Sequence, residues 1–97
     1  MDEARTYAWI FLSVSEQSAS LTDIIAMADG INHAIPTQSE LQKSFRWLQE
    51  HDLVRKDGKR YSLTVAGIAL RDRASSPTIM KTWENVAEHF RRDEPNI

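Results

Sequence analysis

The strongest local signal in the sequence is a helix start at residues 37–40. Thr37 and Glu40 have the spacing of a capping box, in which each side chain bonds the backbone N–H of the other residue. Apolar residues then recur on one helical face, at Leu41, Phe45 and Leu48. Asp52 stands where many helices end in a left-handed residue, a conformation that Asp tolerates better than most residues. The pattern predicts a helix over about residues 37–51.

A β-hairpin is expected directly after this helix. Two short runs flank Asp57-Gly58, a dipeptide that is favoured in two-residue hairpin turns. The hairpin would span about residues 53–63, with Val54 and either Tyr61 or Leu63 facing inward. It would also gather four cations, which are Arg55, Lys56, Lys59 and Arg60.

Two helices are predicted before this unit. Apolar residues at helical spacing indicate a first helix over about residues 2–14, and it is apolar on more than one side. Such a helix needs cover from a later helix or from a partner chain. After a loop over residues 13–20, Ser20 or Thr22 can cap a short second helix, for which Gly30 is a suitable end.

Two more helices are predicted after the hairpin. Thr64 can cap a helix over about residues 65–74, with Val65, Ile68 and Ala69 on one side. Pro77 is suited to the first turn of a last helix over about residues 77–92. The fold class that follows is mainly α with a small β-hairpin, a winged helix-turn-helix with extra N- and C-terminal helices. A length of 97 residues is that of a single domain.

Composition excludes several classes of protein. The chain has no cysteine, which rules out disulfides and thiolate chemistry. No apolar run approaches the length of about 18 residues that a membrane span needs. The first residues lack a basic segment and a cleavage site, so we expect no secretory signal and a cytoplasmic protein.

The sequence carries no recognisable catalytic or metal-binding motif. His33, His51 and His89 lie on different elements, and none has a second ligand at metal-binding spacing. Gly30, Gly58 and Gly67 form no phosphate-binding loop. We therefore expect no enzyme activity, no metal and no cofactor.

Three motifs between Leu21 and Leu70 resemble a known family. They are Leu41-x6-Leu48-x4-Leu53-Val54, Lys56-Asp57-Gly58-Lys59-Arg60-Tyr61 and Leu63-Thr64-x2-Gly67-x2-Leu70. Together they are similar to the recognition helix, wing tip and wing exit of small bacterial winged-helix regulators of the PadR-like and MarR-like kind, although that family often has Gly at the position of Asp52. The resemblance covers residues 21–70, the core of the single domain over residues 1–97. It implies a transcriptional regulator that binds double-stranded DNA.

The residues expected to meet DNA lie on the helix over 37–51 and on the hairpin. Gln42, Lys43 and Arg46 would contact bases, while Ser39 would contact the phosphate backbone. The wing cations Arg55, Lys56, Lys59 and Arg60 would also contact the backbone. The alternative is a solvated helix face beside an exposed turn with solubilising charges.

The distribution of charge favours DNA, although the net charge is −2. Residues 39–62 hold six Lys and Arg against four Asp and Glu, and the remaining residues hold six against ten. Positive charge is therefore concentrated where the fold would place DNA. Glu50 on the same helix weakens this surface, because it would repel a phosphate.

The last helix has an apolar stripe that something must cover. The residues assigned to a dimer contact are Ile79, Met80, Trp83, Val86 and Phe90. Two arrangements remain open: the stripe packs on the first helix, or it pairs with its copy in a homodimer, as the resemblance implies. A second function is also open, a winged-helix module that binds another protein through this stripe and does not bind DNA.

Overall fold

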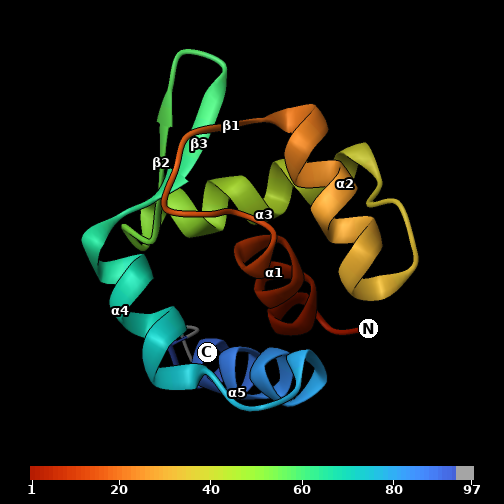
Figure 1. Ribbon diagram of the computed structural model, residues 1–97, viewed down its shortest axis with the longest axis vertical. Coiled ribbons are helices and arrows are strands. Elements are labelled where there is room, and N and C mark those ends of the chain that lie inside the picture. The colour runs from red at the N-terminus through yellow and green to blue at the C-terminus, as the bar shows by residue number, and fades with distance from the viewer. Residues whose placement is uncertain (94–97) are drawn as a thin grey trace.

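The first helix lies at the centre of the molecule, and the other elements are built around it (Figure 1). In the computed structural model, residues 1–93 are described, and they form five α-helices and one three-stranded antiparallel sheet. The elements are α1 (Glu3–Leu12), β1 (Ala19–Ser20), α2 (Leu21–Asn32), α3 (Gln38–Glu50), β2 (Val54–Asp57), β3 (Arg60–Leu63), α4 (Val65–Ala74) and α5 (Ile79–Asp93). The fold class predicted from the sequence is confirmed.

Helix α1 is buried on all sides because α2, α3 and α5 pack against it. Its indole of Trp9 donates a hydrogen bond to the carbonyl oxygen of Ala28 in α2, at 2.8 Å. The indole of Trp83 in α5, whose ring lies 6.4 Å from that of Trp9, donates to the carbonyl oxygen of Arg5, also at 2.8 Å. The two apolar sides of this helix are therefore covered within one chain.

This packing corrects three of the five residues assigned to a dimer contact. Trp83 is 2% exposed, and Val86 and Phe90 are fully buried. Their side chains lie in the protein's own core, so they are not available to a second chain. Ile79 and Met80, at the start of α5, are 48% and 49% exposed.

Helix α2 begins at the first of its two candidate caps but runs past its predicted end. Ser20 and Asp23 form a capping box. Gly30 lies inside the helix, which continues to Asn32 and ends with His33 in the left-handed conformation at φ 53°. The two further helical residues include Ile31, which packs against the core.

Helix α3 has the boundaries and caps that the sequence predicts. The Thr37 hydroxyl accepts from the Glu40 backbone N–H at 3.0 Å, and the Glu40 carboxylate accepts from the Thr37 N–H at 2.8 Å. Asp52 adopts the left-handed conformation at φ 57° and turns the chain into β2. Both local signals at the ends of this helix are confirmed.

The hairpin turn lies one residue later than the sequence indicated. Val54 pairs with Leu63 and Asp57 pairs with Arg60, which leaves Gly58 and Lys59 as the turn. Gly58 has φ 63° and Lys59 does not have a positive φ, the pattern of a type II′ turn with Gly at its first position. The register is set by Val54 and Leu63, because both side chains are buried in the core.

The sheet also contains a strand in a segment that was expected to be a loop. Ala19 and Ser20 form β1, which pairs with Tyr61 and Arg60 of β3. The strand order is β1-β3-β2. Two residues are too few to show the alternation that identifies a strand in a sequence.

Helix α4 buries a different face from the predicted one. Its cap, Thr64, is confirmed, but Val65 is 85% exposed, and the helix packs through Gly67, Leu70 and Ala74. Gly67 allows α4 to lie close to Leu53, because a Cβ at this position would overlap with the backbone carbonyl oxygen of Leu53.

Among the described residues, no helix is both long and apolar enough to cross a membrane.

Candidate nucleic-acid interface

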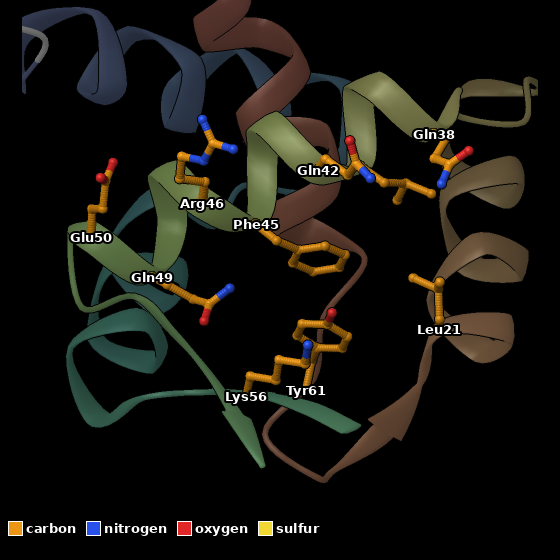
Figure 2. Close-up of a pocket in the computed structure, with 10 residues that line it drawn as sticks. Leu21, Gln38, Gln42, Phe45, Arg46, Gln49, Glu50, Lys56 and Tyr61 are labelled. Carbon is orange, nitrogen blue, oxygen red and sulfur yellow. The ribbon is translucent and has the colours of Figure 1, made fainter. Parts of the chain in front are cut away.

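A surface groove of about 720 Å³ separates helix α3 from the hairpin, and we call it the α3–hairpin groove (Figure 2). Helix α3 forms one wall, β2 and β3 form the other, and the start of α2 closes one end. The lining residues are Leu21, Gln38, Leu41, Gln42, Phe45, Arg46, Gln49, Glu50, Lys56 and Tyr61. The wall formed by α3 is the polar face of the predicted recognition helix.

The rim of the groove is rich in amides and carries cations on two sides. Gln38, Gln42 and Gln49 are exposed on α3, and Arg46 lies on the same face of the helix. Lys56 extends from β2 on the other side (Figure 2). The amides are donors and acceptors at once, and the cations provide binding sites for an anion.

The floor of the groove is aromatic. Phe45 from α3 and Tyr61 from β3 stack with their ring centroids 4.1 Å apart and their planes 13° from parallel. The Lys56 ammonium lies over the Tyr61 ring, 5.8 Å from its centroid. Leu21 adds an exposed apolar side chain at the end of the groove.

The structure brings together only some of the residues predicted to bind DNA. Gln42, Arg46 and Lys56 line the α3–hairpin groove. Ser39 and Lys43 lie on a different side of α3 and line a separate hollow of about 210 Å³ beside the start of α1. Those two are displaced from the groove because they follow Gln38 and Gln42 by one residue, about 100° around the helix.

The four wing cations also differ from one another. Arg55, Lys56 and Lys59 are exposed and make no ion pair with another described residue. Arg60 instead anchors the hairpin, because its guanidinium donates to the Ser18 hydroxyl at 2.6 Å and to the Ser18 carbonyl oxygen at 2.9 Å. We therefore remove Arg60 from the residues that are free to hold a phosphate.

Several cations far from the groove are engaged within the protein. A hydrogen bond to Glu16 raises the pKa of Arg71, and the two side chains are 2.9 Å apart. Arg91 donates to Asp2 at 2.8 Å, and this contact lowers the pKa of the Asp2 carboxyl. By contrast, none of the Lys and Arg side chains of α3 and the hairpin is ion-paired within residues 1–93. Apart from Arg60, which Ser18 holds, their charge is available to an external anion.

Sequence reasoning missed the aromatic floor of the groove. Either Tyr61 or Leu63 was expected to face inward, and Phe45, the stacking partner of Tyr61, comes from another element and could not be identified from spacing. Gln38 and Gln49 were not assigned to the site either, although they share a helical face with Gln42. The spacing of four and seven residues places all three on the exposed face of the helix.

The described residues hold no cluster of three or more His, Asp or Glu side chains that could bind a metal ion. Comparison with known proteins finds no similar chain: neither the protein-family models nor the curated proteins match, and no solved structure does.

Proposed function

We propose that this protein is a DNA-binding transcriptional regulator, with α3 as its recognition helix and the β2–β3 hairpin as its wing. The observation that carries the proposal is the exposed amide and arginine face of α3 beside a hairpin whose free cations have no ion-pair partner among the described residues. The two elements border the same groove, so one nucleic-acid strand can touch both.

The polar face of α3 has the side chains that read base edges in the major groove. Gln can bond N6 and N7 of adenine with its single amide, and Arg can bond O6 and N7 of guanine. Gln38, Gln42 and Gln49 provide the first kind of contact, and Arg46 provides the second. The major groove, about 12 Å wide, admits one α-helix.

The wing would supply contacts to phosphates. Arg55, Lys56 and Lys59 project from a hairpin that stands at the end of the molecule farthest from α5 (Figure 1). Each phosphate that a cation neutralises releases condensed counterions, so binding weakens as salt is added. Ser39 and Lys43 lie on the flank of α3, so we reassign Lys43 from the bases to the phosphates, which Ser39 would also contact.

The direct test is fluorescence anisotropy of a labelled random-sequence duplex at about 50 and 200 mM salt. The wild-type protein should bind, and its affinity should fall steeply between the two concentrations. The double variant Arg46→Ala, Lys59→Ala should lose about tenfold or more in affinity, because one base contact and one phosphate contact are removed.

Lys81→Ala is the control for the loss of a surface cation away from the groove, on α5. It should bind like the wild type. No binding at about 50 mM salt would overturn the proposal, as would equal losses in the control and in the double variant.

The alternative, a protein-interaction module that uses the last helix, has weaker support. The apolar stripe on which it depended is largely buried, since Trp83, Val86 and Phe90 pack inside the chain. A homodimer through α5 remains part of our proposal. Of the five residues assigned to its contact, Ile79 and Met80 are exposed enough to take part. Two copies related by a two-fold axis would present two recognition helices to a palindromic site.

A further inference from the structure

We propose that the α3–hairpin groove holds an unpaired nucleobase, so that the protein prefers DNA with a single-stranded or extrahelical nucleotide over fully paired DNA. This inference rests on the proposed function, because it assumes that the nucleic acid lies on this face. It adds a binding site and a ligand class that base reading by α3 does not require.

The shape and size of the groove suit a single nucleotide. The polar side chains of α3 stand along the rim of a hollow (Figure 2). The volume of about 720 Å³ lies within the range of roughly 300–1,000 Å³ that is typical of small-molecule sites. A space of this size suits a nucleotide and is too small for a duplex.

The aromatic floor of the groove offers a surface on which an unpaired base can stack. Phe45 covers one face of the Tyr61 ring, and both rings line the groove. In paired DNA both faces of a base are covered by its neighbours, so an aromatic floor has nothing to stack on. An unpaired base offers its face, and stacking on aromatic side chains is the general way in which proteins hold single strands.

Lys56 does not block this stacking. Its ammonium is 5.8 Å from the centre of the Tyr61 ring, near the outer limit of a cation–π contact, and its side chain is exposed. The ammonium can therefore move aside to the phosphate that precedes or follows the base. The Tyr61 hydroxyl makes no hydrogen bond to another described residue and is free to bond the ligand.

The rim provides the polar contacts that a base needs. Gln42 and Gln49 present amides that can bond the donors and acceptors of a Watson–Crick edge, which is exposed only when the base is unpaired. Arg46 and Lys56 lie on opposite walls and outnumber the one acid of the groove, Glu50. A nucleotide with its flanking phosphates matches this arrangement of amides, aromatic floor and net positive charge.

The test compares four labelled DNAs of the same sequence in an anisotropy titration. They are a fully paired duplex, the duplex with one extra unpaired adenine, the duplex with an abasic residue at that position, and the single strand. The wild type should bind the unpaired-adenine duplex about five- to a hundredfold more tightly than the abasic one, the range that stacking of one base provides. The single strand shows whether the base needs an adjoining duplex, and preference for it over the paired duplex also supports the inference.

Substitution of Tyr61 tests whether the preference comes from the groove. Tyr61→Phe keeps the ring and should keep most of the preference for adenine over the abasic residue, whereas Tyr61→Leu should abolish it. Titration of the paired duplex at two salt concentrations shows separately how each variant affects the contacts to phosphates. Circular dichroism melting shows whether Tyr61→Leu is folded.

A second readout does not depend on any variant. With 2-aminopurine as the unpaired base, stacking in the groove should quench its fluorescence on binding by the wild type. Equal affinity for adenine and abasic duplexes, or a rise in fluorescence on binding, would overturn the inference. If the paired duplex still binds in a salt-dependent manner, the proposed function survives that result, and if none of the four DNAs binds, both fail.

Discussion

At the scale of single residues, two glycines in helices differ in whether their surroundings leave space for a side chain. Gly67 in α4 faces the backbone of Leu53, and an added Cβ would overlap with that carbonyl oxygen. Gly30 in α2 has nothing within 4 Å of the position where a Cβ would stand. Neither residue has a positive φ, so the difference between them comes from packing.

Gly67→Ala should therefore destabilise the protein by about 2 kcal/mol or more, because α4 must move away from the start of β2. Gly30→Ala should stabilise it by about 0.5–1 kcal/mol, since Gly costs a helix interior that much relative to Ala. Urea unfolding followed by circular dichroism measures both changes. If the two substitutions change the free energy of unfolding equally, α4 does not lie close to the backbone of Leu53.

Residue identity alone did not reveal these roles. The motif that contains Gly67 was recognised in the sequence, but the reason for a glycine there is the nearby carbonyl of Leu53, fourteen positions earlier. Arg60 is a similar case, because its partner Ser18 lies in a segment that has no pattern of its own. Contacts between residues far apart in the chain cannot be read from local spacing.

At the scale of elements, an exposed ion pair joins the N-cap of the first helix to the last helix. Asp2 caps α1 by accepting from the Arg5 N–H at 2.9 Å, and it also accepts from Arg91 of α5 at 2.8 Å. The hydrogen bond from Arg91 is the main reason that the pKa of the Asp2 carboxyl is below its ordinary value of 3.8. A carboxyl with a lowered pKa stabilises the folded state above its unfolded pKa, and this contribution is lost as the pH falls through the folded pKa.

Asp2→Asn keeps a capping side chain but removes the charge. It should lower stability by less than about 1 kcal/mol at neutral pH, because both partners are about half exposed and screened by solvent. The difference from the wild type should shrink as the pH falls below about 4 and should also shrink in about 1 M salt. Urea unfolding across this pH range provides the measurement, and a difference that grows with acid would contradict the assigned ion pair.

Local signals predicted the elements well where one residue and its near neighbours decide the structure. The Thr37–Glu40 capping box and the left-handed Asp52 are such cases, and both were predicted from four or fewer adjacent positions. The hairpin turn was misplaced by one residue, because its register depends on Val54 and Leu63 reaching the core together. Strand β1 could not be predicted, since it exists only by pairing with β3.

At the scale of the whole molecule, the partner of α5 decides how the chain is assembled. The sequence predicted an amphipathic last helix but left open whether it packs on α1 or on a second chain. The structure shows Trp83, Val86 and Phe90 packed against α1. The sequence could not distinguish the two arrangements, because the same apolar stripe fits either one.

Substitutions at two positions of α5 should therefore have different effects. Trp83→Glu should destabilise the fold by about 3 kcal/mol or more, because it buries a charge and removes a packed indole. Met80→Glu lies at an exposed position and should leave the fold intact. Size-exclusion chromatography with light scattering, together with thermal melting, measures both effects. If Met80→Glu converts a dimer to a folded monomer, the proposed dimer contact at the start of α5 is correct. If the variant has the same mass in solution as the wild type, this contact is wrong.

The central claim is that the polar face of α3 and the hairpin together bind nucleic acid. The most direct measurement is an NMR titration of the ¹⁵N-labelled protein with a short duplex at about 50 mM salt. We expect the perturbed amides to concentrate at residues 38–49 and 55–61, with the side-chain amides of Gln42 and Gln49 among them, and α5 to be unaffected. Perturbations confined to α4 and α5, or none at all, would contradict the claim.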